Sequence, residues 1–264
     1  MLAYNAAYMA HRPGRAWRPL IDTTVAAQLL YGSPGFYSTW RRGTDFYDEG
    51  ALIWLGVDAK LRALTNDKRS LDDFAKRFYG MDNGSYVTKT YTFDDVVKAL
   101  DNVAAYDWSG YLENLLDRTH EQAPLGGVTR GGWKLVYSSE PNSYEQAREA
   151  IRKYTDATFS IGLTVGKGGR IDDVLWNGPA FKAGLAPGME IIGVNGNAYG
   201  KGVLERAIAA SAKQGGGTIT IAVKGEGVVE RYTIKYDGGL RYPHLERITG
   251  TPDYLDEIVA PVKN

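Results

Sequence analysis

The spacing of apolar residues changes once along the chain, and this change limits the fold more than any other feature. Up to about residue 120, apolar side chains recur three and four positions apart, as they do in amphipathic helices. Beyond Asp156 they form short runs separated by glycine-rich turns, which is typical of strands. One uniform architecture cannot satisfy both patterns. The sequence therefore predicts an α + β chain of two domains, with a boundary near residue 153.

Capping signals divide the first part of the chain into helices. Asp48 and Glu49 indicate the first turn of a long helix, because carboxylates there favour the positive end of the helix dipole. Ser70 and Thr92 each precede two aspartates within three residues, and Asp107 precedes another apolar run. The predicted buried faces are Leu52, Leu55, Ala59 and Arg62; Phe74 and Phe78; Val96, Val97, Leu100 and Val103; and Trp108, Tyr111, Leu112 and Leu115.

The second part of the chain reads as strands with a few helices. A strand is expected at 133–137, and a short helix should open at Ser143 and end near Tyr154. Apolar runs predict further strands at 159–165, 171–175, 190–194, 218–223 and 229–236, with one helix at 202–213 between them. Near the carboxyl end, the expected helical anchors are Tyr254, Leu255, Ile258 and Val259.

Composition excludes several classes of protein. Lys plus Arg equals Asp plus Glu, 31 of each, so charge gives no reason to expect nucleic acid or an anionic membrane as partner. No apolar run reaches the roughly 18 residues of a membrane span. The chain has no cysteine, which excludes disulfides and thiolate metal sites.

Residues after 153 resemble a PDZ domain. The Ser-Ile-Gly-Leu segment at 160–163 resembles the loop that binds a peptide carboxylate in such domains. Segment 174–185 is similar to their strand, Gly-Pro-Ala turn and short helix, and 187–196 to the next strand and turn. One departure is Met189, where these domains usually carry Asp. The resemblance implies a partly open β-barrel with helices, and it spans about 80 residues in the expected order.

The PDZ resemblance implies a groove for a peptide or protein carboxyl terminus. Gly162 would let the loop backbone approach a carboxylate, and Leu163 to Val165 would form an edge strand able to pair with an extended peptide. The helix at 202–213 would form the opposite wall. The expected groove residues are Ile161, Gly162, Leu163, Val165, Leu204 and Ile208. In the alternative interpretation these side chains are core, and the groove packs on the protein's own upstream domain.

A second resemblance covers the helical part. Segment 45–55, Asp-Phe-Tyr-Asp-Glu-Gly-Ala-Leu-Ile-Trp-Leu, resembles the tyrosine-bearing helix start of gluzincin aminopeptidases. Together with 14–20 and with 131–137 leading into a PDZ domain, it resembles the glycyl aminopeptidase family across essentially the whole chain. The resemblance implies four parts. They are the helical end of a thermolysin-like catalytic domain at 1–125, a linker at 126–153, a PDZ domain at 154–237 and a tail packing back at 238–264.

The family resemblance implies a catalytic role for Tyr47. Its phenol would donate a hydrogen bond to the oxyanion of the tetrahedral intermediate, since a phenol stays protonated at neutral pH. The alternative is ordinary packing beside Phe46 at a helix start. Glu49 stands where relatives often have Lys, which departs from the family pattern.

The zinc motif expected of that family is missing from this chain. A catalytic zinc needs three protein ligands and a water, and HExxH supplies the first two. The chain has three histidines, and His120 opens a segment that ends in Pro124 instead of a second histidine. His11 and His244 stand far apart in sequence. Zinc is therefore expected in a full-length protein, with its ligands upstream, and not in this chain.

These observations leave three hypotheses open. The preferred one is the carboxyl-terminal portion of a zinc aminopeptidase that removes amino-terminal Gly or Ala, inactive alone and exported or periplasmic by family resemblance. The first nine residues look like a helix interrupted at its start, which favours a natural protein that continues upstream. The runner-up is a non-catalytic PDZ interaction module, and the third is a degenerate homologue that never carried the zinc motif.

Overall fold

The computed structural model describes residues 1–31, 35–212, 217–225 and 228–261. In these ranges all elements up to Arg130 are helical, and from Trp133 on small sheets occur with further helices, which confirms the predicted α + β class. None of the described sheets closes into a barrel. Lys213, the expected end of one helix, lies outside the described residues. Among the described helices, none combines the length and apolar character required to cross a bilayer.

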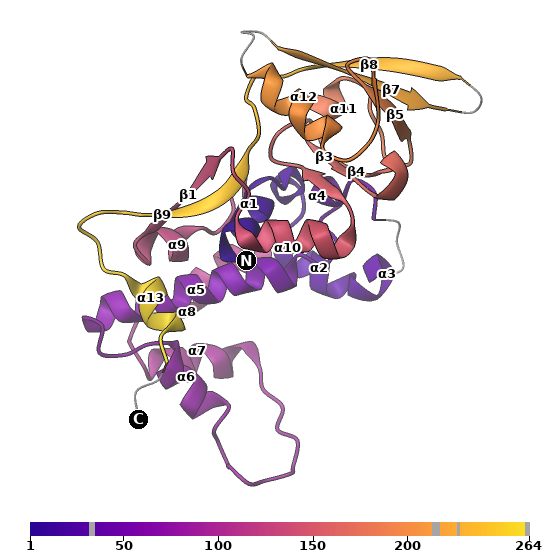
Figure 1. The fold of residues 1–264 in the computed structure, drawn as a ribbon. Helices are drawn as coiled ribbons and strands as arrows, with labels where there is room; N and C mark the ends of the chain where they lie inside the picture. Colours follow the sequence, from indigo (N-terminus) through magenta and orange to yellow (C-terminus); the bar gives the residue numbers. More distant parts are fainter. Residues whose placement is uncertain (32–34, 213–216, 226–227, 262–264) are drawn as a thin grey trace. The chain divides into compact units, whose positions relative to one another are not determined.

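Figure 1 labels the elements in chain order. The helices are α1 (Leu2–Ala10), η1 (Pro13–Ala16), α2 (Leu20–Val25), α3 (Ala27–Tyr31), α4 (Ser38–Arg41), α5 (Phe46–Thr65), α6 (Leu71–Phe78), α7 (Phe93–Asp101), α8 (Trp108–Asp117), α9 (Gly126–Arg130), α10 (Ser143–Arg152), η2 (Lys167–Gly169), α11 (Pro179–Lys182), α12 (Val203–Ser211) and α13 (Tyr254–Val259). The strands are β1 (Trp133–Ser138), β2 (Thr155–Ala157), β3 (Leu163–Val165), β4 (Ile171–Val174), β5 (Glu190–Val194), β6 (Asn197–Ala198), β7 (Thr218–Lys224), β8 (Val229–Lys235) and β9 (Tyr242–Arg247).

The chain forms two compact units, and each is assembled from separate segments. Unit 1 combines Met1–Arg15, Ala26–Thr44 and Leu135–Leu245. Unit 2 combines Ala16–Val25, Asp45–Lys134 and the chain from Glu246 onward. The span predicted as a PDZ domain, 154–237, lies within unit 1 together with amino-terminal segments. Whether the four predicted domains are the natural divisions stays a prediction.

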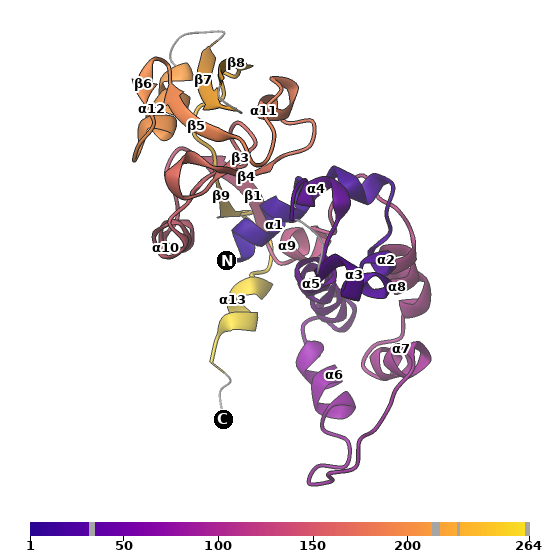
Figure 2. The ribbon, with the colours of Figure 1, turned by 90° about the vertical axis from the view of Figure 1, so that its right-hand side faces the viewer.

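Unit 1 holds a three-stranded sheet, ordered β2-β3-β4, and a four-stranded sheet, ordered β6-β5-β7-β8. Figures 1 and 2 show β5, β7 and β8 side by side, and α11 and α12 contact this sheet. Alternate side chains of β7 are buried, as expected for a strand with one face on a core. The core shared by these elements includes Ile161, Leu163, Val174, Ile191, Leu204, Ile208, Ile219, Ile221 and Ile234.

The turns of unit 1 follow the residue types that the sequence provides. Asn195 and Gly196 have φ of 48° and 80°, which confirms the predicted turn with positive φ between β5 and β6. Pro179 occupies the first turn of α11, where its missing N–H costs nothing. Met189, at the position of the usual Asp, accepts a hydrogen bond at Sδ from the Ala186 amide at 3.4 Å.

Amino-terminal residues dock on the β4 strand within unit 1. The Asp173 carboxylate accepts hydrogen bonds from the Tyr37 amide at 2.8 Å and from Ser38 Oγ at 2.7 Å. The Trp40 and Trp176 rings stack with centroids 4.9 Å apart. Helix α4 is therefore held on β4 and on the residues that follow it by both polar and aromatic contacts.

Helices α6, α7 and α8 of unit 2 begin where the sequence predicted. Ser70 and Thr92 form capping boxes with Asp73 and Asp95, and Asp107 accepts from the Gly110 amide at the start of α8. The long helix α5 starts at Phe46, two residues before Asp48. The helices share a core of Leu20, Ile53, Val57, Leu61, Phe74, Phe78, Leu100, Trp108 and Leu112.

Asp58 links α5 to the start of α6. Its Oδ1 accepts from the Leu71 amide at 2.7 Å, and its Oδ2 pairs with Arg62 Nε at 2.8 Å. Arg62 also pairs with Asp67 and Glu257, at 2.7 and 2.9 Å. A nearly buried carboxylate on the α5 core face is thus satisfied by an amide and a guanidinium, as buried charges require.

Three expectations about local structure were wrong. The predicted strand 159–165 is shorter, because only Leu163–Val165 is extended, and a separate strand β2 precedes it. The anchors Ile258 and Val259 are 40% and 78% exposed, so α13 packs mainly through Leu255. Strand β9, which pairs with β1, was not anticipated.

Candidate functional site

Tyr47 lies in the first turn of α5, within unit 2. Its side chain is 65% exposed, while the adjacent Phe46 packs against the helical core. The two rings are 4.4 Å apart between centroids. The apolar face of a 20-residue helix therefore fixes the backbone of Tyr47, and its ring is available on the surface. This is a position from which a phenol can meet a ligand.

The acidic neighbours of Tyr47 differ in exposure. Asp48 is exposed, whereas Asp45 and Glu49 are buried. Asp48 and Glu49 both occupy the first turn of α5, as predicted. Glu49 is 3% exposed and Tyr47 is 65% exposed, so these two side chains of the turn differ in their access to solvent.

Each of the three histidines bonds to a main-chain carbonyl. His11 Nδ1 lies 2.8 Å from the Ala7 oxygen, His120 Nε2 lies 2.6 Å from that of Asn114, and His244 Nε2 lies 2.8 Å from that of Glu140. Burial lowers the pKa of His11. Among the described residues, no group of three or more His, Cys, Asp or Glu side chains is placed to hold a metal ion.

Helix α9 supports α5 through an approach of two backbones. A Cβ on Gly127 would lie 2.5 Å from the Gly56 nitrogen and 2.6 Å from the Leu55 carbonyl carbon. Only glycine fits such a contact. Residues 126–132 were expected to belong to a linker, and no periodic spacing of apolar residues predicted this short helix. The contact between Gly56 and Gly127 was not predicted, because no sequence pattern indicates that two backbones approach closely.

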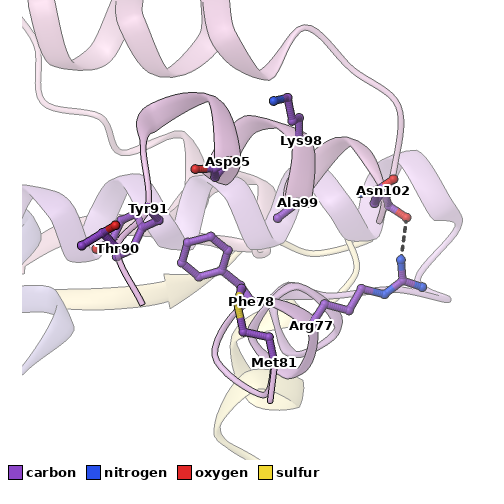
Figure 3. Close-up of a pocket in the computed structure, with 9 residues that line it drawn as sticks. All are labelled: Arg77, Phe78, Met81, Thr90, Tyr91, Asp95, Lys98, Ala99 and Asn102. Atoms are coloured by element: carbon purple, nitrogen blue, oxygen red, sulfur yellow. Dashed lines mark hydrogen bonds between the residues drawn. The ribbon is translucent and has the colours of Figure 1, made fainter. Parts of the chain in front are cut away.

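A pocket of about 400 Å³ lies between α6, α7 and the segment that joins them (Figure 3). Its walls include the Phe78 and Tyr91 rings, 5.0 Å apart between centroids. Asp95, the one carboxylate in its lining, accepts hydrogen bonds from Thr92, which lower the pKa of Asp95. The pocket therefore offers apolar surface, the cationic side chains of Arg77 and Lys98, and one carboxylate. The remaining lining residues are Met81, Thr90, Ala99 and Asn102.

The loop predicted to bind a carboxylate has its amides directed at one oxygen. The amides of Ser160, Ile161 and Gly162 donate to the Ala157 carbonyl at 3.2, 3.1 and 3.0 Å. Gly162 has φ of 80°, and a Cβ there would lie 3.1 Å from the Leu175 Cβ. The acceptor of these amides is part of the same chain.

Strand β3 is not an edge strand, contrary to expectation. It pairs with β4 on one side and antiparallel with β2 on the other, with Thr155 opposite Val165 and Ala157 opposite Leu163. Both hydrogen-bonding edges of β3 are therefore used within unit 1. Ile161, Leu163, Val165, Leu204 and Ile208 are brought together, but as buried members of one core. Whether these residues bind a peptide stays a prediction.

Helix α10 places two carboxylates beside β2. Glu149 Oε1 accepts from the Asp156 amide at 2.7 Å. Burial raises the pKa of Glu149, and burial also raises the pKa of Glu145 to about 7. Glu145 is 5% exposed and caps α10, its Oε2 accepting from the Asn142 amide at 3.4 Å.

The raised pKa of Glu145 predicts a pH-dependent stability. Between the ordinary carboxyl pKa and about 7, the unfolded chain is ionised while folded Glu145 holds its proton, so the free energy of unfolding falls as pH rises through this window. Glu145→Gln keeps the capping acceptor and removes the titration. We expect the variant to gain stability relative to the wild type between pH 5 and pH 8, measured by urea unfolding. Parallel stability curves for the two proteins would contradict this, and exposed Glu140→Gln is the control.

Comparison with solved structures finds a protein of similar fold. The chain resembles the crystal structure of an aminopeptidase N family protein from Idiomarina loihiensis, with a TM-score of 0.65 and 16% identity. The similarity covers 98% of this chain and 43% of that one, so the chain spans less than half of its neighbour. No protein-family model matches the sequence, and no curated protein does. At this level of identity the comparison establishes a shared fold.

Proposed function

We propose that this chain is the carboxyl-terminal portion of a zinc-dependent aminopeptidase of the glycyl aminopeptidase type, which removes small amino-terminal residues such as Gly or Ala. The observation that carries the proposal is the likeness of fold to an aminopeptidase N family protein along 98% of the chain. That neighbour is more than twice as long as the matched region, which leaves room for a metal centre in a part that this chain does not contain.

Tyr47 is the residue of this chain assigned to the reaction. Its exposed phenol, fixed by the first turn of α5, would donate a hydrogen bond to the oxygen that becomes negative when the scissile carbonyl is attacked. A preorganised donor lowers the barrier because it favours the charge that appears only in the transition state. Phe46 supports this role by packing into the core directly beside it.

The residues described here do not provide a zinc site of their own. No set of three His, Cys, Asp or Glu ligands is placed together among them, and each of the three histidines bonds to a main-chain carbonyl. In the proposed enzyme the metal, held by residues outside this chain, supplies an activated water. The share of this chain is limited to substrate contacts, support of α5 and the Tyr47 hydrogen bond.

The proposal is tested by comparing this chain with the longer protein proposed to contain it. The longer protein should contain one equivalent of zinc, release Gly or Ala from aminoacyl anilides and lose activity to a chelator. The isolated chain should do none of these. Zinc-dependent cleavage by the isolated chain would overturn the proposal, and a longer sequence without HExxH would favour the degenerate homologue.

A second candidate function is a non-catalytic module that binds peptide or protein carboxyl termini. The convergence of three loop amides on a single oxygen favours it, because this is the arrangement that a carboxylate needs. The occupied edge of β3 opposes binding in the conformation described. These two observations lead to the inference below.

A further inference from the structure

Strand β2 has the features of a bound peptide in the site predicted for a carboxyl terminus. It runs antiparallel to β3, with Asp156 opposite Thr164 and Ala157 opposite Leu163. Its last carbonyl, that of Ala157, receives the amides of Ser160, Ile161 and Gly162. An extended peptide added to a sheet edge would make the same main-chain hydrogen bonds, with its carboxylate at that oxygen.

The end of β2 also defines the side chain that the site accepts. The Ala157 methyl is 4% exposed and belongs to the same core as Ile161 and Leu163. A replacement at this position has room for a small apolar side chain, because close-packed cores resist added volume. The structure therefore selects ligands that end in a small apolar residue with a free carboxylate.

Side-chain contacts from neighbouring elements hold the three residues of β2. The Asp156 carboxylate accepts from Tyr4 Oη at 2.9 Å and lies 3.7 Å from Arg148 Nη1. The Arg148 guanidinium lies over the Tyr4 ring, 3.8 Å from its centroid. Thr155 Oγ1 lies 3.5 Å from Glu205 Oε1 of α12, which is the limit for a hydrogen bond. Asp156 is the residue of β2 with the most side-chain partners among those described.

The residue that leads into β2 is less well satisfied. The Tyr154 hydroxyl is buried and has no hydrogen-bond partner among the described residues. Leaving a buried polar group unpaired costs about 1–3 kcal/mol. This cost is relieved if the segment moves into water, so it favours release of β2, whereas the Asp156 contacts oppose release.

We propose that β2 is a displaceable internal ligand, with Asp156 as its latch, and that its release opens the β3 edge and the 160–162 amides to a peptide carboxyl terminus. The inference rests on the proposed peptide-binding function and is independent of Tyr47. The apparent affinity of a peptide is reduced by the fraction of molecules in which β2 is released. The Asp156 carboxylate also accepts from the Thr158 amide at 3.1 Å, so Asp156→Ala removes one contact of the loop, whereas Tyr4→Phe removes only the hydroxyl that donates to Asp156. Either substitution weakens the latch and should increase binding.

The probe is a fluorescent peptide with the sequence of residues 150–157, Ala-Ile-Arg-Lys-Tyr-Thr-Asp-Ala, with a free carboxylate. Fluorescence polarisation should show no saturation with the wild-type chain up to about 1 mM, and at least about 10-fold tighter binding by Asp156→Ala. Tyr4→Phe, which removes one latch hydrogen bond, should give an intermediate result. The same peptide with a carboxamide end should lose binding, and exposed Asp172→Ala on β4 should behave as wild type.

A reversible lock separates displacement of β2 from binding elsewhere. The chain has no cysteine, so Thr155→Cys with Val165→Cys places one pair at directly opposed positions of β2 and β3. Added to Asp156→Ala, the oxidised pair should abolish peptide binding and its reduction should restore it. The reduced form controls for the loss of the Val165 side chain.

Hydrogen exchange distinguishes the two ways in which the inference can fail. Asp156→Ala should speed exchange of the 160–162 amides, and the peptide should slow it again. Unchanged exchange would show that Asp156 is not the latch. Faster exchange without binding would show that the loop does not accept a carboxylate, which overturns the peptide-binding function as well. Binding to the oxidised protein, or equal binding by wild type and Asp156→Ala, would overturn displacement.

Discussion

Replacing Tyr47 with phenylalanine in the proposed zinc-containing protein should reduce kcat by about 10²–10³-fold, the cost of removing one donor from an oxyanion site. The substitution removes a single oxygen from an exposed ring and leaves the contact of Phe46 with the core in place. We therefore expect unchanged zinc content and unchanged thermal stability. The measurement is steady-state hydrolysis of an alanyl anilide, together with metal analysis of both proteins.

The matched control for this prediction is Tyr86→Phe. Tyr86 is a fully exposed tyrosine in the segment between α6 and α7, and it should tolerate the same loss of a hydroxyl without effect. Wild-type turnover in Tyr47→Phe would remove Tyr47 from the reaction. Loss of zinc or of folding would instead indicate a structural role for the hydroxyl.

Gly127→Ala should have the largest effect on stability, lowering the free energy of unfolding by about 3 kcal/mol, the upper end for overpacking. The new methyl would meet the backbone of α5 at Gly56 and Leu55, at distances that atoms do not adopt. Backbone cannot rotate away as a side chain can, so α9 and α5 must separate. Urea unfolding measures the change.

Gly126→Ala provides the control one residue earlier in the same helix. Its methyl would meet only the end of the Arg130 side chain, at 3.1 Å, which can move. We expect a change within about 0.5 kcal/mol, because the helical preference of alanine compensates for a small adjustment. Equal losses of unfolding free energy in Gly126→Ala and Gly127→Ala would show that the α5–α9 contact does not require the absence of a side chain at residue 127.

Local chemistry explains which parts of the fold could be predicted. Caps at Ser70, Thr92 and Asp107 are satisfied by amides within three residues, so sequence spacing alone located those helix starts. The Asn195-Gly196 turn is equally local. Helix α10 opens at Ser143 as predicted, and Asn142 with Glu145 forms its capping box.

Contacts between distant residues explain what could not be predicted. Strand β2 is three residues long, and its position depends on Tyr4, which is 152 positions from Asp156. No periodicity in Thr-Asp-Ala indicates a strand, so β3 was expected to have a free edge. Five of the expected groove residues lie in one core, but a shared core does not reveal which segment covers them.

The docking of α4 on β4 has a consequence for how this protein can be made and divided. A recombinant piece limited to 154–237 would lack Tyr37, Ser38 and Trp40. The Asp173 carboxylate would lose two hydrogen-bond donors, and the ring face of Trp176 that stacks on Trp40 would be exposed to water. Unit 1 also contains Leu135–Leu245, so it cannot fold completely until more than a hundred residues after position 44 have been synthesised. Nascent chains therefore cannot form the Trp40–Trp176 stack until the ribosome has passed Trp176, and chaperone demand should be highest in that interval.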